Sequence, residues 1–453
     1  IEHPHYEKYC VVFGAFFSQS KVYILEMFYD LKSKNYVCQA NIIDENYKVL
    51  KKELFQISKD DAKGFGLQSL YYNADRINLN NLGIFEQEEE SIWSQAFKRK
   101  ASVSDNRSSS ELVLKVNNNK TLFSIAMTFE YGNENFMKLF LFDTDLNKKI
   151  QKDFVSEYKK VINKNIALHD SSEVVYLTQK VYSDDLKNKK DGGKYFYEIK
   201  KITPNDLQNQ IIEVESHYLP SLTIFYKENN LYGIGFYSDV KDLRYSGISF
   251  FKIDSENLEL KNTKYNLFNE QFVLDKYGKL KDQELKHIVI KDVFWNSNND
   301  VSINAEEVYV VSGHNNSPTI YNYDDIITVN LSSDGDLIFA RNINKRQGSQ
   351  SKVGLYISYT SLLLNKNNYF FINTKEKLKE LSNDRLEFDH VHKNKSCLYV
   401  ISVNNNGDFQ FIEVLNEAKT EVPFMVSKGI VIDNSVIFLG QKGSKKQLLK
   451  VTL

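Results

Sequence analysis

The run Asp324-Asp-Ile-Ile-Thr-Val-Asn-Leu-Ser-Ser-Asp-Gly-Asp-Leu-Ile-Phe-Ala-Arg-Asn-Ile343 contains two stretches of alternating side chains that meet at an Asp-Gly pair. Alternation with a period of two places every second residue, such as Ile327 and Val329, on the same face of a strand. Glycine adopts the positive φ angles that a tight hairpin requires, and Asp-Gly is a frequent hairpin turn. The run therefore predicts a β-hairpin.

Variants of this unit recur along the chain, each with an apolar alternating strand, a turn rich in Asp, Asn or Gly, and a second strand rich in Lys and Ile. Their turns lie at 143–147, 204–206, 254–257, 334–335 and 404–407. Blocks of roughly 45–75 residues with about four antiparallel strands are typical of β-propellers. We therefore predict an all-β fold, a β-propeller of about seven four-stranded antiparallel blades within a range of six to eight. Because the spacing is irregular, tandem β-sandwich domains are the alternative.

The same reading predicts a single propeller domain over 1–453, with a long polar insertion at about 60–110 and a flexible loop at about 184–194. The insertion contains Trp93, and we expect a short helix in it near 88–98. We also expect the last strand, 446–453, to complete a blade with N-terminal residues and so leave no open edge.

The composition narrows the classes of function. The 58 basic and 59 acidic side chains give a formal net charge of -1, which supplies no electrostatic attraction to nucleic acid. No run approaches the ~18 apolar residues of a transmembrane helix. The sequence starts at Ile1 without a targeting segment, so we expect a processed start. The three cysteines, Cys10, Cys38 and Cys397, are too few and too far apart for a disulfide framework; buried thiols are favoured, and a Cys10–Cys38 bridge is the alternative.

Residues 286–453 contain motifs more specific than an alternating pattern. In chain order these are Ala305–Val311, Tyr321–Asn330, the Asp-Gly turn, Lys345-Arg-Gln347, Tyr369–Asn373 and Val436–Gly443. Together they resemble a group of uncharacterised secreted or cell-envelope β-propeller-like proteins of Bacteroidota. Phe339 departs from the Trp that is common in that group, and Thr374 departs from an Asp. The resemblance implies a compartment (periplasm, outer-membrane surface or outside the cell) and a fold, but no activity.

Two His-x-His pairs are the candidates for metal binding: His3 with His5, and His390 with His392 beside Asp389. In a strand, residues i and i+2 share a face, so both imidazoles of a pair can reach one ion. A third ligand is needed, and no HExxH-type spacing is present. Solvated histidines are therefore the favoured reading, and we expect neither a metal nor another cofactor.

Glu306 and Asp325 are the candidate catalytic residues, because glycosidases use two carboxylates at a defined separation. Both lie at strand starts in the region of strongest resemblance. The alternative is structural: Asp325 accepts backbone hydrogen bonds, and Glu306 pairs with Lys345 or Arg346. Nucleophile and phosphate-binding motifs such as GxSxG and the P-loop are absent from the sequence.

Aromatic side chains beside expected loops are the candidate binding residues, namely Trp93, Trp295, Tyr321 and Tyr323. Such side chains stack on sugar rings or anchor a protein partner, although in propellers they also pack between blades. The sequence contains no clear catalytic constellation, so it favours a non-enzymatic protein-interaction or scaffold module of the bacterial cell envelope. A subunit of an outer-membrane transport, secretion or motility complex fits this description. A glycan-binding or glycan-cleaving propeller is the alternative.

Overall fold

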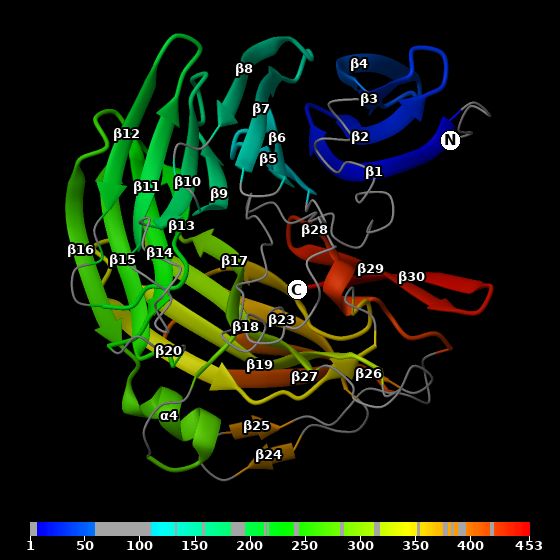
Figure 1. Cartoon of the computed structure of the whole chain (residues 1–453). Helices are drawn as coiled ribbons and strands as arrows, with labels where there is room; N and C mark the ends of the chain where they lie inside the picture. Colours follow the sequence, from blue (N-terminus) through cyan, green and yellow to red (C-terminus); the bar gives the residue numbers. More distant parts are fainter. Residues whose placement is uncertain are drawn as a thin grey trace. The chain divides into compact units, whose positions relative to one another are not determined.

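The computed structural model describes most of the chain (Figure 1). The described residues are 7–58, 110–131, 134–155, 158, 160–182, 195–212, 214, 217–239, 244–280, 285–311, 318–350, 354–374, 379–381, 385–387, 396–416 and 421–453. Trp93, the two His-x-His pairs, Asp389 and the segments 60–109 and 184–194 lie outside these ranges.

The described chain forms a succession of antiparallel sheets in which each strand pairs with its neighbour in sequence. The first three sheets consist of β1 (Glu7–Ser18), β2 (Lys21–Asp30), β3 (Asn35–Ile43) and β4 (Val49–Ser58); β5 (Ser110–Val116), β6 (Leu122–Tyr131), β7 (Glu134–Asp143) and β8 (Lys148–Val155); and β9 (Lys160–Leu168), β10 (Val175–Tyr182), β11 (Tyr195–Ile202) and β12 (Leu207–Ile212).

Four further sheets follow in the same manner. They consist of β13 (Thr223–Lys227), β14 (Asn230–Tyr237), β15 (Gly247–Asp254) and β16 (Leu260–Leu267); β17 (Ile288–Trp295), β18 (Val301–Val311), β19 (Ile320–Leu331) and β20 (Leu337–Ile343), with β21 (Gly348–Ser349) added to β19; β22 (Thr360–Leu364), β23 (Asn367–Thr374), β26 (Cys397–Val403) and β27 (Phe409–Leu415); and β28 (Ile430–Ile432), β29 (Ser435–Lys442) and β30 (Lys445–Thr452). The chain is thus a seven-bladed β-propeller, and the predicted fold class is confirmed.

The remaining elements are small. They are the helix α4 (Glu270–Tyr277), the 3₁₀ turn η3 (Val426–Lys428) and the hairpin of β24 (Lys379–Leu381) with β25 (Arg385–Glu387). Within the described part of the chain, no helix is long and apolar enough to cross a membrane.

The chain divides into two compact units, and the boundary passes through the fourth sheet. One unit comprises Ile1–Gly235 with Phe251–Lys261, and the other comprises Phe236–Phe250 with Asn262–Leu453. In each unit the apolar cores lie between successive sheets: Phe55 stacks on Phe140 in the first unit, and Phe371 packs against Phe438 in the second. Whether the whole chain acts as one domain stays a prediction.

The Asp-Gly hairpin joins β19 to β20, and the preceding sheet holds its turn. Gly335 has a φ of +85°, and a Cβ atom at this position would lie 2.1 Å from the ring of Phe250. From β16, Asn262 donates to the carbonyl of Asp334 at 2.9 Å, and Asn266 donates to the carbonyl of Gly335 at 2.8 Å. The turn therefore both reverses the chain and fastens one blade to the next.

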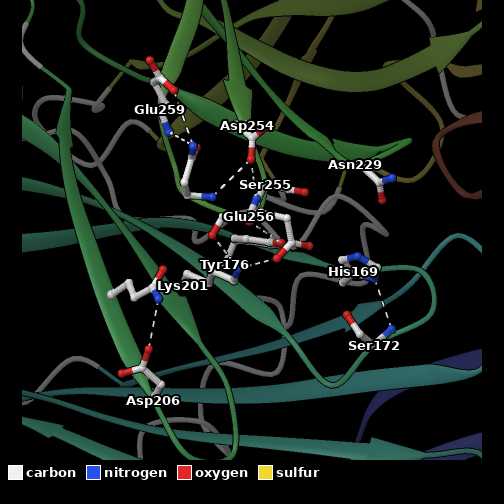
Figure 2. A network of polar contacts seen from close by, with 12 residues as sticks. His169, Ser172, Tyr176, Lys201, Asp206, Asn229, Asp254, Ser255, Glu256 and Glu259 are labelled. Carbon is white, nitrogen blue, oxygen red and sulfur yellow. Dashed lines mark hydrogen bonds and ion pairs between the residues drawn. The ribbon is translucent and has the colours of Figure 1, made fainter.

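The same arrangement occurs in the other unit, where the third sheet holds the β15–β16 turn (Figure 2). The Tyr176 hydroxyl donates to the carbonyl of Ser255 at 3.1 Å, and Lys201 Nζ donates to the carbonyl of Glu256 at 2.7 Å. Inside the turn, Asp254 Oδ1 accepts the N–H of Glu256 at 2.7 Å, which is an Asx-turn contact. Asp and Asn residues thus recur in these turns because their side chains satisfy the turn's own N–H groups.

The seventh sheet contains the last strand of the given sequence, β30. β30 pairs with β29, and β1 belongs to the first sheet, where it pairs with β2. In the described residues, no N-terminal strand joins β28, β29 and β30. Closure by strand 446–453 and N-terminal residues stays a prediction, because residues 1–6 lie outside the described ranges.

Candidate functional site

The candidate site of the second unit is centred on Glu306, which lies on β18 in the middle of the fifth sheet. Its side chain has no exposed surface, and neither has that of Lys345, which follows β20. Lys345 Nζ lies 2.9 Å from Glu306 Oε1, and the Ser358 hydroxyl donates to Oε2 at 2.5 Å. Lys291 Nζ, on β17, lies 3.6 Å from the same oxygen. The ion pair between Glu306 and Lys345 is one of the two pairings that the sequence indicated.

The remaining contacts of Lys345 tie it to two neighbouring segments. Its Nζ donates to the carbonyl of Tyr323 at 2.5 Å and to Gln347 Oε1 at 3.2 Å. Gln347 is itself buried and donates to the carbonyl of Asn373, on β23 of the sixth sheet, at 2.8 Å. All three ammonium protons therefore have acceptors, as a buried lysine requires.

Asp325, on β19, lies in an adjoining set of contacts with α4. Lys276 Nζ is 2.6 Å from its Oδ2, and the backbone N–H of Lys345 donates to its Oδ1 at 3.0 Å. Lys276 also pairs with Glu307 at 2.8 Å. Asp325 thus accepts a backbone hydrogen bond, as the structural reading of the sequence expected, and it is bound to an ammonium group as well.

α4 is attached to β20 by a second buried ion pair. Asp275 is fully buried, and its two oxygens face Arg341 Nε at 2.6 Å and Nη2 at 3.1 Å. The helix begins at the N-cap Asn269, which accepts the N–H of Phe272, and ends at Gly278 in the left-handed conformation. These caps are sequence signals that allow a helix to be predicted here, whereas we predicted one only near 88–98.

The charges around Glu306 decide its protonation. Burial alone would raise the pKa of Glu306, but the ammonium groups of Lys345 and Lys291 and two hydrogen bonds hold that pKa below its ordinary value. Burial opposes the charge of Lys276, yet Asp325 and Glu307 raise the pKa of this lysine. A general acid needs the opposite shift in a carboxyl group, towards neutral pH. Glu306 is therefore ionised and neutralised by its neighbours.

Asp292, also on β17, is a carboxyl group in this cluster that the sequence analysis missed. Burial raises its pKa, and the negative charge of Glu306 raises it as well, whereas the hydrogen bond that the Ser361 hydroxyl donates at 2.5 Å and the charge of Lys291 partly oppose the shift. Two neighbouring carboxyl groups with opposite shifts are a recognised sign of acid–base chemistry. Here, however, the ionised member is fully enclosed, so it can touch no substrate.

The three candidate aromatic residues in the described chain do not gather at one place. Tyr321 and Tyr323 are half-buried near the start of β19, opposite Val310 and Val308. Trp295 ends β17 and pairs with Val301, which faces the last residue of β19. Trp295 therefore lies at the opposite end of the sheet from the two tyrosines, and their proposed binding role stays a prediction.

A second polar cluster, in the first unit, surrounds His169 (Figure 2). Its Nδ1 accepts the backbone N–H groups of Ser171 and Ser172, each at 3.1 Å. Nδ1 is therefore unprotonated and the ring proton is on Nε2, which lies 2.8 Å from the hydroxyl of Tyr226. That hydroxyl donates to Asn229 Oδ1 at 3.1 Å, so the cluster is a chain of satisfied hydrogen bonds.

No group of three His, Cys, Asp or Glu side chains in the described residues is arranged to hold a metal ion. Cys38 and Cys397 are buried free thiols, which is the state that the sequence favoured for them. His390, His392 and Asp389 lie outside the described ranges, so the metal hypothesis stays a prediction.

No protein family model matches the chain, and no curated protein matches it. Among solved structures, it is similar to an acylaminoacyl peptidase (8% identity, TM-score 0.41, covering 98% of this chain and 51% of that one). It is also similar to an α-L-arabinofuranosidase from Lactobacillus brevis (10% identity, TM-score 0.32, covering 68% and 91%). The chain thus spans about half the length of the peptidase that it matches. Similarities at this level assign no activity.

Proposed function

We propose that this chain is a non-catalytic protein-interaction module of the bacterial cell envelope, such as a subunit of an outer-membrane transport, secretion or motility complex. The non-catalytic part of the proposal rests on the enclosed ion pair of Glu306 and Lys345. A carboxylate that acts on a substrate must reach it, whereas both oxygens of Glu306 are bound by Lys345 and Ser358 and its side chain has no exposed surface.

The envelope part of the proposal rests on the resemblance of residues 286–453. A protein partner is favoured because a propeller offers a rigid scaffold with several surfaces for binding. Large apolar side chains are exposed on outer strands, among them Leu267 at 61%, Ile412 at 67% and Leu448 at 76%. Exposed apolar groups of this kind contribute to protein interfaces when they gather, although single ones are common on any surface.

One observation favours the alternative, a glycan-cleaving propeller: the pKa of Asp292 is raised while that of Glu306 is lowered. The two functions predict different results for the same substitution. If the chain is a glycan-cleaving propeller, Asp292→Asn abolishes hydrolysis, because the substitution removes the group that protonates the leaving oxygen. In a scaffold it leaves partner binding intact.

The experiment is purification of the tagged full chain from its source cells after in-cell crosslinking, followed by mass spectrometry and assay against a glycan panel. We expect one protein partner in constant ratio and no hydrolysis above background. A chain that purifies alone and cleaves a glycan, with the activity lost in Asp292→Asn, overturns the proposal.

A further inference from the structure

The turn between β9 and β10 belongs to the third blade, and it contacts the blades before and after it within the first unit. On one side, Asp170 Oδ1 accepts the N–H of Asn118 at 3.1 Å, and the carbonyl of Asp170 accepts the side chain of Asn117 at 2.9 Å. Both asparagines lie in the β5–β6 turn of the second blade. On the other side, the centroid of the His169 ring lies 4.4 Å from that of Tyr226, on β13 of the fourth blade. Asn118 also donates to the carbonyl of Tyr226 at 3.2 Å, so three blades meet at this turn.

His169 holds the β9–β10 turn through the unprotonated nitrogen of its ring. Nδ1 accepts the N–H groups of Ser171 and Ser172, each at 3.1 Å. A proton added to Nδ1 would point at these two donors, so an imidazolium cannot keep either bond. The contact between Nε2 and the Tyr226 hydroxyl, at 2.8 Å, survives because Nε2 carries its proton in both states.

The titratable groups around His169 come from its own turn and from β10, β11, β13 and the β15–β16 turn; they are Asp170, Tyr176, Lys201, Tyr226 and Glu256 (Figure 2). Burial is the largest cause that lowers the pKa of His169, whereas the two carboxylates raise it and Lys201 lowers it. Glu256 is itself paired with Lys201 at 3.1 Å. Burial raises the pKa of both tyrosines, so these hydroxyls stay neutral wherever His169 titrates.

We infer that His169 is a pH-operated lock on this junction: the neutral ring holds the β9–β10 turn in place, and protonation of Nδ1 releases it. The turn then loses the bonds from Ser171 and Ser172, and Asp170 is no longer fixed against Asn118. Because the ring stays bound to Tyr226, the contact that loosens is the one between the second and third blades. The inference goes beyond the proposed function and does not depend on it, since it needs no partner.

A turn of the same kind with a non-titrating acceptor supplies a comparison within the chain. Between β26 and β27, Asn404 Oδ1 accepts the N–H groups of Asn406 and Asp408 at 2.8 and 2.9 Å. An amide oxygen gains no proton in the range where histidine titrates. This turn should therefore keep both bonds at acidic pH.

The direct test is hydrogen exchange of the full chain at about pH 7.5 and about pH 4.5, on either side of the ordinary histidine pKa of about 6.5. Each amide is compared by its protection factor, which removes the change of the intrinsic exchange rate with pH. We expect the protection of Ser171, Ser172 and Asn118 to fall several-fold at the lower pH, while that of Asn406 and Asp408 stays the same. Equal changes in the two turns, or no change in either, overturn the inference.

His169→Asn separates the ring from the carboxylates beside it. The Asn side-chain oxygen can accept the same two N–H groups and does not titrate, while Asp170 and Glu256 remain. We expect the Ser171 and Ser172 amides of this variant to keep their protection at about pH 4.5. A loss as large as in the wild-type chain contradicts the inference, because the carboxylates would then cause it.

A second measurement needs no variant. Nitrogen NMR of the wild-type ring follows the proton on Nδ1, and the amide signals of Ser171 and Ser172 are recorded in the same titration. We expect Nδ1 to gain its proton only below the ordinary pKa of about 6.5, with both amide signals shifting in the same transition. A ring that titrates while these two signals stay unchanged overturns the inference.

Discussion

At the scale of single residues, the chain's most informative side chain is Glu306, because its surroundings separate a catalytic role from a structural one. A buried carboxylate is costly unless ions and hydrogen bonds compensate for its lost hydration. Lys345, Ser358 and Lys291 supply that compensation, and they come from β20, β22 and β17 or the segments next to them. The residues of this cluster therefore satisfy one another's charges and hydrogen bonds.

Glu306→Gln tests this dependence. The substitution leaves the Lys345 ammonium buried without its counter-charge, so we expect the free energy of unfolding to fall by about 3–5 kcal/mol. Urea denaturation followed by circular dichroism measures the change. Glu421→Gln is the control, since its pair with Lys445 is exposed to solvent, and we expect no measurable shift in its midpoint. Equal stabilities of the two variants would show that the buried pair does not stabilise the fold.

Replacing both members of the pair gives a second, independent result. In Glu306→Leu with Lys345→Met neither member of the pair remains as a buried charge without the other, so we expect the double variant to be more stable than either single variant. The coupling energy from a double-mutant cycle measures this. Additive effects of the two substitutions would contradict a direct ion pair.

His169 gives the chain a predicted pH dependence. Burial is the largest cause that lowers the pKa of His169, and the two N–H groups donated to Nδ1 leave no room for a second ring proton. The unfolded chain binds a proton near pH 6.5, whereas the folded chain binds it only at lower pH. The contribution of neutral His169 to the free energy of unfolding is therefore fully present above about pH 6.5. It is lost as the pH falls through the lowered pKa that His169 has in the folded chain.

His169→Asn isolates that contribution, because the Asn side-chain oxygen can accept the same N–H groups and does not titrate. Thermal unfolding of both proteins between about pH 5 and 7.5 brackets the ordinary histidine pKa. We expect the wild-type midpoint to fall more steeply towards the acidic end than that of the variant. Parallel curves would show that another group causes the pH dependence.

At the scale of elements, the hairpin turns connect one blade of the propeller to the preceding one. The Asp-Gly turn predicted from 324–343 is present, and its residues also contact β16 and Phe250 of the preceding blade. Strand pairs and turns were predictable because alternation and Asp, Asn and Gly positions are local signals. The contacts of the turn were not, since they join residues about 70 positions apart, as in the 72-residue separation of Asn262 and Asp334.

Gly335→Ala measures how much the conformation of that turn and its contact with Phe250 contribute to stability. The added Cβ meets both a left-handed backbone and the Phe250 ring, so we expect a loss of about 2–4 kcal/mol. Gly443→Ala is the control: its φ is +61°, but nothing lies within 4 Å of the added atom. Its loss should be limited to the backbone strain of about 1 kcal/mol. Equal losses would mean that the contact with Phe250 is unimportant.

At the scale of the whole molecule, the number of blades could be predicted from the sequence, while the composition of the site could not. Seven blocks were visible because each repeats the same local pattern. The sequence left two possible partners for Glu306, Lys345 and Arg346, because these two basic residues are adjacent. Lys276, Asp275 and Ser358 were missed, because a short helix and a loop residue enter the cluster through tertiary packing alone.

The central claim is that the Glu306 cluster supports a scaffold and performs no chemistry. The most direct test is in-cell crosslinking of the double variant Glu306→Leu with Lys345→Met beside the wild-type chain, with partner yield measured by mass spectrometry and glycan hydrolysis measured on the same samples. We predict the same partner at the same yield for both proteins and no hydrolysis by either. A wild-type chain that cleaves a glycan and a folded double variant that does not would contradict the claim.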